Sequence, residues 1–247
     1  IDWQEFKSLQ RSFFKANVID IELLTDHAIF ASTFKIAKEN KIKSILSGTN
    51  YLSEHGIPRS WAWNKLDLRN IKDIHSNYEN TSINSFPKTS TFKWFLMRQF
   101  GIGGSFEEPL NIINYDKEKA KEELKKYFDW EDYGGKHFES VFTKFYQSYI
   151  LPQKFGVDKR RAHLSALIRS GQRKRKSVIK ELARPFYDKM ELKAEKAYIV
   201  KKLGFSENEF DEIMTHNPVP HDFYKTDETY IGPIKKLAKF LKFKSKL

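Results

Sequence analysis

The sequence predicts an α/β fold in which a short α/β segment is followed by a mostly helical region. A helical pattern at 26–38 precedes a short apolar strand pattern at 42–46 and a polar loop at 47–50, which is the order of an α/β unit. The pattern between Tyr51 and about Pro109 is irregular, but most of the elements expected after residue 60 are helices. Aromatic residues make up 15% of the 247 residues, which is typical of a packed globular protein. We therefore expect three parts: an α/β segment at 1–60, a helical region at 61–230 and a basic tail at 231–247.

The first fifty residues contain two expected helices and one expected strand. The first helix, at 2–16, has an apolar face made by Trp3, Phe6, Leu9 and Phe13. For the second helix, at 26–38, the expected cap is Thr25 or Asp26, and the expected buried residues are Ile29, Phe30, Thr33, Phe34 and Ala37. The strand then leads into Ser47, Gly48, Thr49 and Asn50. Because ligands of open parallel sheets bind beyond the carboxyl ends of strands, this loop is either a ligand loop or an ordinary turn.

Helical spacing and capping residues predict most of the later elements. Expected helices lie at 67–78, 89–100, 116–130, 177–183, 191–203 and 206–214. Asp116 is the expected cap of the third, Gly204 ends the fifth, and Ser206 with Glu209 predicts a capping box. The Gly-rich stretch at 101–104 breaks the chain. It is not a phosphate loop, because neither a P-loop lysine nor a Rossmann spacing follows it.

The stretch 133–172 is the most informative part of the chain. After a Gly134-Gly135 turn, an apolar face of one helix is expected from Phe138, Val141, Phe142, Phe145 and Tyr149. His137, Ser140 and Lys144 then fall together along its other side, and Pro152 is expected to end the helix.

A second helix in this stretch is expected between Asp158, its cap, and Ser170-Gly171, with Leu164, Leu167 and Ile168 buried. Arg160 and Arg161 lie in its first turn, where the helix dipole disfavours cations. At least one of them is expected to point toward the packed side, where an arginine needs a partner. Two interpretations stay open: a salt-bridge cluster with Asp158 and Glu139, or a binding site for a phosphate or carboxylate.

Charge and composition limit the class of protein. Residues 151–247 carry 23 Lys and Arg against 12 Asp and Glu, and the last seventeen residues hold six lysines and no acid. That tail has the pattern of a basic amphipathic helix, which is either a solvated end or a contact to a membrane surface, an acidic partner or nucleic acid. Since no apolar run is long enough to span a bilayer and no signal segment opens the chain, a cytoplasmic protein without a transmembrane segment is expected. The absence of cysteine excludes disulfides, thiolate metal sites and a catalytic cysteine within these residues.

Four segments together resemble the N-acetyl sugar amidotransferase family, relatives of asparagine synthetase in the PP-loop ATP-pyrophosphatase superfamily. They are ILSGTN at 45–50, SEHG at 53–56, the long motif at 132–172 and ARPFYD at 183–188. The resemblance implies that residues 1–60 are the remainder of a nucleotide-binding α/β domain. It also implies an ATP-dependent reaction, in surface polysaccharide or flagellin glycan biosynthesis, that turns the acetamido group of a nucleotide-linked N-acetyl sugar into acetamidino. ATP, with Mg²⁺, would adenylylate the acetamido oxygen, and ammonia from separate glutaminase and synthase-like subunits would displace AMP.

The same resemblance implies roles for particular residues. Cations in a dry site stabilise charge that develops on phosphate, and a histidine can accept a proton from ammonia. The implied catalytic residues are Lys136, His137, Lys144, Arg160, Arg161 and His163. The implied nucleotide-binding residues are Ser47, Gly48, Thr49 and Asn50, and the implied substrate-binding residues are Glu54, His55, Glu139 and Ser140. No metal-ligating residue is assigned, and each histidine has a structural hydrogen bond as its alternative role.

This chain differs from the family pattern in two respects, which limit the transfer of these roles to its residues. The Ser-Gly-Gly-x-Asp-Ser loop that grips pyrophosphate is absent from the 247 residues, and the chain starts at Ile1, so we expect a chain that lacks an upstream segment. Relatives also tend to have cysteines near the segment that corresponds to residues 25–27, whereas this chain has none.

The alternative interpretation is a nucleic-acid-binding module, related to tRNA-modifying enzymes, because the pI is about 9.5 and RKRK occurs at 173–176. The nearly neutral first 150 residues argue against it, so nucleic acid is not the expected partner.

Overall fold

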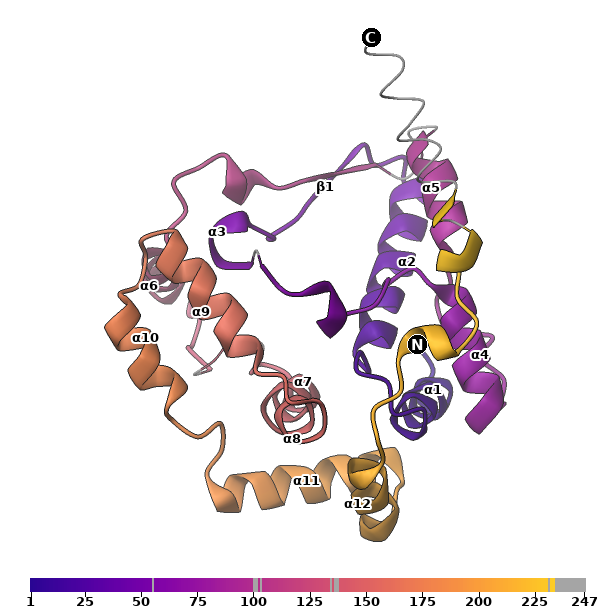
Figure 1. The fold of residues 1–247 in the computed structure, drawn as a ribbon. Coiled ribbons are helices and arrows are strands. Elements are labelled where there is room, and N and C mark those ends of the chain that lie inside the picture. Colours follow the sequence, from indigo (N-terminus) through magenta and orange to yellow (C-terminus); the bar gives the residue numbers. More distant parts are fainter. Residues whose placement is uncertain are drawn as a thin grey trace. The chain divides into compact units, whose positions relative to one another are not determined.

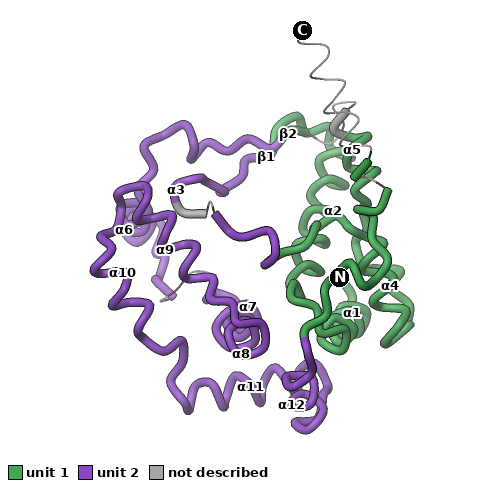
Figure 2. The backbone as a smooth tube through the Cα atoms, in the orientation of Figure 1, with its two compact units in different colours: residues 1–45, 62–105, 218–247 green, residues 46–61, 106–217 purple. Residues whose placement is uncertain are grey.

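The computed structural model describes residues 1–54, 56–99, 102, 104–133, 135, 138–230 and 232–233, without the side chains of residues 53, 54, 98 and 99. Within this part the fold is mostly helical, with one small two-stranded sheet (Figure 1). The chain divides into two compact units (Figure 2). Unit 1 comprises residues 1–45, 62–105 and 218–247, and unit 2 comprises residues 46–61 and 106–217. The expected basic tail lies almost wholly outside the described residues.

Unit 1 is built on helices α1 (Trp3–Lys15), α2 (Leu23–Glu39), α4 (Leu68–Tyr78) and α5 (Thr91–Gln99). Asp2 caps α1 by accepting a hydrogen bond from the amide of Glu5, and α1 packs against α4. The fully buried side chains here include Leu9, Phe13, Leu23, Leu24, Ile71, Ile74 and Phe86. The expected helices at 2–16, 67–78 and 89–100 are thus confirmed to within a few residues.

Helix α2 begins a turn earlier than its polar residues suggested. It follows Glu22, whose side chain makes no capping bond, so the expected cap at Thr25 or Asp26 was wrong. Leu23 and Leu24 are fully buried and extend the apolar side of the helix by one turn. Ile29, expected in the core, is 57% exposed, because the buried side of α2 runs through His27, Ala28, Ala31 and Phe34 instead.

A buried polar network fastens residues 218–230 to the rest of unit 1. The carboxylate of Asp67 caps α4 through the amide of Asn70 and also accepts from Trp63 Nε1 at 3.0 Å and Thr226 Oγ1 at 2.5 Å. His221, in the 3₁₀ turn η4 (His221–Phe223), stacks on Trp63 and lies with Nδ1 2.8 Å from Asn70 Oδ1. These bonds link segments about 150 residues apart.

The two strands, β1 (Ser44–Leu46) and β2 (Ser105–Glu107), run parallel. The Ser105 amide donates to Lys43 O at 2.9 Å and the Ser47 amide donates to Glu107 O at 2.8 Å, so both strands advance in the same direction. The strand expected at 42–46 is therefore confirmed, whereas β2 was not predicted. The described part of the chain contains no further strand that could belong to a larger nucleotide-binding sheet.

Unit 2 contains the stretch 133–172 and the helices that follow it. Its longer helices are α6 (Lys117–Phe128), α9 (Lys159–Arg169), α10 (Arg175–Leu182), α11 (Lys189–Leu203) and α12 (Glu207–Thr215). Short elements are α3 (Tyr51–Glu54), η1 (Arg59–Trp61) and η2 (Pro109–Asn111). The expected caps Asp116 and Asp158, the left-handed Gly204 and the Ser206–Glu209 capping box are all present.

The helix between residues 141 and 155 differs from its prediction at both ends. It starts at α7 (Val141–Phe145), with Ser140 as the cap rather than a helical residue, and Val141 is 43% exposed. It then passes through a π-helical turn, η3 (Tyr146–Ile150), into α8 (Leu151–Phe155), so Pro152 does not end it. The amide of Leu151 bonds Tyr146 O, five residues back, and Pro152 therefore falls in a first helical turn, where its missing N–H costs little.

Candidate functional site

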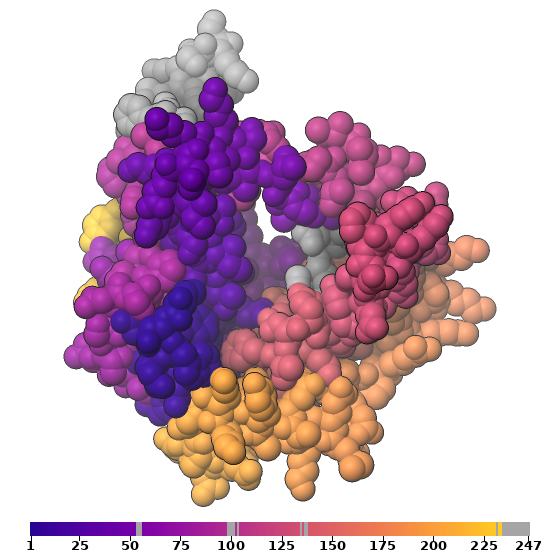
Figure 3. Space-filling model, turned by 180° about the vertical axis from the view of Figure 1, so that it is seen from behind, coloured from indigo at the N-terminus to yellow at the C-terminus, as the bar shows by residue number. Residues whose placement is uncertain are grey.

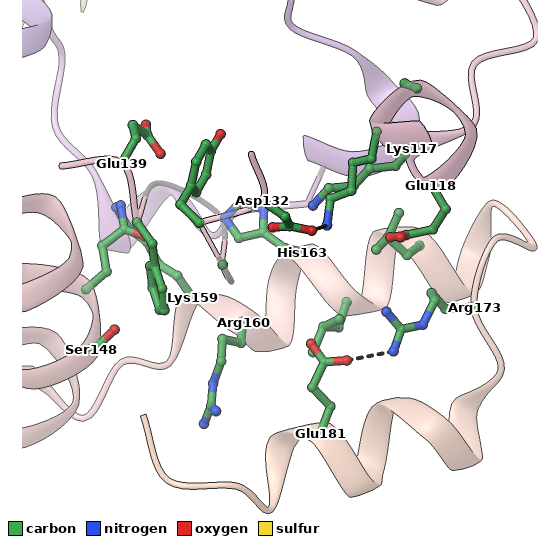
Figure 4. Close-up of a pocket in the computed structure, with 18 of the residues that line it drawn as sticks. Lys117, Glu118, Asp132, Glu139, Ser148, Lys159, Arg160, His163, Arg173 and Glu181 are labelled. Carbon is green, nitrogen blue, oxygen red and sulfur yellow. Dashed lines mark hydrogen bonds and ion pairs between the residues drawn. The ribbon is translucent and has the colours of Figure 1, made fainter. Parts of the chain in front are cut away.

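Unit 2 encloses a cavity of about 830 Å³ (Figure 4). This volume lies within the usual range for small-molecule sites. Its walls come from the 47–50 loop, α6, the described residues between 130 and 139, η3, α9 and the segment around α10. The lining combines six Lys and Arg side chains with four acidic ones: Lys117, Lys121, Lys159, Arg160, Arg173 and Arg184, and Glu118, Asp132, Glu139 and Glu181. Cations exceed anions, which favours an anionic ligand.

The loop after β1 contributes Gly48 and Asn50 to this cavity. The Ser47 and Thr49 hydroxyls do not line it. They lie 2.9 Å from each other, and the Thr49 hydroxyl donates to Glu108 Oε1 at 2.9 Å, which holds the loop in place. Asn50 is buried, at 7% exposure, whereas a Cβ added to Gly48 would meet no atom within 4 Å. Gly48 therefore leaves open space on the cavity wall.

Helix α9 is positioned against this loop by α3. The two helices pack together, and the Ser170 hydroxyl at the end of α9 donates to Leu52 O at 3.2 Å. Leu164 and Leu167 on the buried side of α9 pack with Val178 of α10, and Ile168 packs against that cluster, as expected. This leaves His163 of α9 on the cavity wall. The loop and α9 thus meet although they are more than 100 residues apart.

Arg160 is held from several directions. Its guanidinium pairs with Asp158 at 2.9 Å, donates to Arg184 O at 3.0 Å and lies 3.5 Å from the ring centroid of Phe186. The salt-bridge interpretation therefore describes Arg160, although Arg160 still lines the cavity. Arg161 is exposed and is not among the lining residues. The first turn of α9 thus directs the two arginines to different surroundings.

Arg184 is a cation that the sequence reasoning missed. Its backbone is fixed by Arg160, but among the described residues no hydrogen bond or ion pair engages its guanidinium. By contrast, Lys121 pairs with Asp132 at 3.0 Å and Arg173 pairs with Glu181 at 2.6 Å. The signal was present in ARPFYD at 183–188, a segment that carries the family resemblance and contains this arginine.

Lys144 lies in a separate cluster. Its ammonium group contacts Glu191 at 2.5 Å and Glu195 at 2.8 Å, and Tyr187 donates to Glu195 at 2.6 Å. Desolvation by itself lowers the pKa of Lys144, but hydrogen bonds and charges from the two glutamates outweigh this and raise it. Burial and the same glutamates also raise the pKa of Tyr187. Lys144 is thus charged and internally paired.

The other predicted site residues divide into three groups. Glu139 lines the cavity, whereas Ser140 serves as the cap of α7, accepting from the amide of Thr143. Lys136, His137 and His55 lie outside the described residues, and so does the side chain of Glu54. The predictions for these four residues, and for the shared face of His137, Ser140 and Lys144, stay predictions.

Lining residues that were not predicted supply most of the apolar wall. They include Tyr115, Trp130, Tyr133, Phe138 and Phe186, of which Trp130 and Tyr133 form an edge-to-face pair with centroids 5.5 Å apart. Aromatic rings beside cations suit a ligand that has both a flat ring and a negative charge. No three His, Asp or Glu side chains gather as metal ligands in the part of the chain that the structure describes.

None of the described helices is long and apolar enough to cross a bilayer. Comparison with known proteins finds no curated protein and no solved structure with significant similarity to the chain. One family model does match: residues 139–242 match the model described as "LPS biosynthesis protein WbpG-like, C-terminal domain". The matched segment starts at Glu139 on the cavity wall and includes Arg160, His163 and Arg184. Residues 139–242, less than half of the chain, are therefore similar to a WbpG-like C-terminal domain of LPS biosynthesis proteins.

Proposed function

We propose that the chain belongs to an ATP-dependent amidotransferase of LPS biosynthesis, which converts the acetamido group of a nucleotide-linked N-acetyl sugar into acetamidino. The WbpG-like match supports the pathway. The resemblance at 45–50, 132–172 and 183–188 supports the reaction. One structural observation carries the proposal furthest: Gly48 and Asn50 line the same cavity as Arg160 and His163. The loop assigned to the nucleotide and the helix assigned to the chemistry thus share one site.

The lining residues fit a nucleotide. The aromatic side chains offer faces to a base, and the basic residues offer charge to phosphates. Arg184 is the best candidate for phosphate, because the other cations with described pairs already have carboxylate partners. ATP supplies an adenylyl group that makes the acetamido oxygen a leaving group. Mg²⁺ is usually held by phosphates with one or two carboxylates, and Glu118, Asp132, Glu139 and Glu181 are the carboxylates available on the wall.

The chain's own groups have distinct tasks in this proposal. The guanidinium groups of Arg184 and Arg160 stabilise negative charge that grows on the phosphate as the acetamido oxygen is adenylylated. Gly48 gives the nucleotide room close to the backbone. An imidazole nitrogen of His163 accepts the proton that ammonia loses as its nitrogen bonds to the acetamido carbon.

Binding tests the site without requiring turnover. Titration of the 247-residue chain with a UDP-linked N-acetyl sugar and with ATP, followed by calorimetry, should show binding that Arg184→Gln weakens about tenfold or more. Lys119→Gln, an exposed lysine of α6 outside the cavity, is the matched control and should bind normally. Equal binding by both variants would remove the cavity from the proposal.

Turnover tests the reaction. The chain would be joined to a segment with the Ser-Gly-Gly-x-Asp-Ser loop, since its 247 residues contain none. We expect AMP release with the sugar and ammonium salt, but not with glutamine, because the chain has no cysteine to release ammonia. Added glutaminase and synthase-like subunits should make glutamine effective. AMP release that is independent of the sugar would contradict the proposed substrate.

A further inference from the structure

Helix α11 has an outward face that carries only basic and apolar side chains. The residues one, four, five, eight, nine and twelve positions after Lys189 lie with it on one half of the helix. The set is Lys189, Met190, Lys193, Ala194, Ala197, Tyr198 and Lys201. All seven are exposed, Met190 at 82% and Tyr198 at 54%. We call this set the α11 face, and the side chains of this helix reach the molecular surface in the orange region of Figure 3.

The two acidic residues of α11 are paired with Lys144, which lies on α7. The side chain of Glu195 is 17% exposed, and that of Glu191, at the border of the α11 face, is 47% exposed. The remaining lysine at mid-helix, Lys196, is paired with Asp211 of α12 at 2.5 Å and does not belong to the face. Among the described residues, Lys189, Lys193 and Lys201 make no ion pair. Internal pairing therefore leaves a net positive outer surface.

We propose that the α11 face binds the surface of a bilayer that contains anionic phospholipids. Three lysines without partners complement the negative headgroups, and each contributes attraction that falls off within a Debye length. The two large exposed side chains between them suit the headgroup boundary, where Tyr is enriched and a flexible Met can enter. An acidic protein would use the lysines but would leave an 82% exposed methionine without a stated role, so the bilayer accounts for more of the face.

Such binding would be weak and reversible. Three lysines and two partly inserted side chains do not approach the affinity of a lipid anchor or a spanning helix. The association should weaken steeply as salt is added, because it depends on charge. It is independent of the cavity, and therefore stands or falls separately from the proposed reaction.

Vesicle sedimentation of the full 247-residue chain provides the first test. We expect binding to vesicles of mixed phosphatidylglycerol and phosphatidylcholine, none to phosphatidylcholine alone, and loss of binding with added salt. Changing Lys189, Lys193 and Lys201 together to Gln should lower the partition coefficient about a hundredfold. The matched control changes three exposed lysines of α6, Lys119, Lys125 and Lys126, to Gln and so removes the same charge.

A second measurement locates the contact. Since the chain has no cysteine, Met190→Cys accepts an environment-sensitive fluorophore at one place only. Its emission should shift to the blue when anionic vesicles are added, whereas a label at Glu122→Cys on α6 should not respond. Equal losses in the two triple variants, or binding that persists without the α11 lysines, would assign the membrane contact to other cations such as the basic tail and would overturn the proposal. Failure of the unaltered chain to bind anionic vesicles, or binding only to an acidic polypeptide, would do so as well.

Discussion

The ammonium nitrogen of Lys144 lies 2.8 Å from Oε1 of Glu195, across the contact between α7 and α11. The Lys144 side chain is only 12% exposed, and that of Glu195 is 17% exposed. The pair therefore ties the informative stretch 133–172 to the helix that carries the proposed membrane surface. We expect this contact to matter more for stability than an ordinary surface ion pair.

Lys144→Met should lower the free energy of unfolding by about 1–3 kcal/mol, because it leaves two carboxylates near a half-buried tyrosine without their cation. Lys193→Met, on the outward face of the same helix, should change it by less than about 0.5 kcal/mol. Urea denaturation measures both. In a double-mutant cycle with Glu195→Gln, an interaction energy near zero would mean that the contact is not a stabilising one.

The two neighbouring arginines of α9 should behave differently. Arg160→Ala removes a paired guanidinium, two hydrogen bonds to carbonyl groups and a contact over Phe186, so a loss of about 2 kcal/mol is expected. Arg161→Ala should cost less than about 0.5 kcal/mol, since that side chain is exposed. Thermal unfolding compares them, and equal losses would contradict the assignment of partners given above. Arg160→Lys should recover little, because an ammonium group cannot reproduce the planar fork.

Substitution of Gly48 should affect nucleotide binding, whereas substitution of Gly104 should affect the stability of the fold. Gly48→Val should leave stability nearly unchanged, because a Cβ there meets no atom within 4 Å, but should obstruct nucleotide binding in the cavity. Gly104→Val should instead destabilise the chain. Its φ is +77° and an added Cβ would lie 3.0 Å from Ile42 O. Calorimetric titration with ATP, paired with a melting curve for each variant, separates the effects. Normal ATP binding by Gly48→Val would place the nucleotide elsewhere.

The free energy of unfolding should decrease as pH is lowered from 6.5 to about 4, the window set by the pKa of His221. Desolvation by burial lowers the pKa of this side chain to about 4, from an ordinary value of 6.5. Between these values the unfolded chain binds the extra proton and the folded chain does not. The stabilisation is therefore complete above pH 6.5 and decreases as pH falls toward 4. From pH 7 to pH 4.5 the expected loss is about 2 kcal/mol.

His221→Gln is the control for this prediction. A glutamine can still accept from the amide of Asp20 and donate to Asn70, but it does not titrate. Urea midpoints of this variant should therefore depend less on pH over the same window. Some dependence should remain, because desolvation by burial also lowers the pKa of His27. A slope as steep as that of the unaltered chain would show that His221 is not the group responsible.

Local signals in the sequence predicted local structure well. The caps Asp116 and Asp158, the capping box of Ser206 and Glu209, and the left-handed Gly204 each depend on contacts within a few residues, so a short window contains the cause. Strand β2 was missed because three residues, Ser-Phe-Glu, are too few to show a period, and its pairing partner lies some sixty residues away.

The site was harder to predict because its geometry depends on distant residues. Gly48, Asn50, Glu139, Arg160 and His163 were assigned to the site largely by resemblance, and the structure brings these five to one cavity. Spacing alone left the partners of Lys144 unknown, since Glu191 and Glu195 are about fifty residues further along the chain. Arg184 was overlooked for a related reason: a cation becomes notable only when its neighbours are seen to be paired elsewhere.

The π-helical turn η3 shows how a helix can contain one more residue while its flanking segments keep the same buried sides. The amide of Leu151 bonds Tyr146 O, five residues back, whereas an uninterrupted α-helix would use the carbonyl group four residues back. One additional residue is thus absorbed in a single wide turn while both flanking segments keep their apolar sides inward. A related sequence whose helix is regular here should align with a gap of one residue between 146 and 150.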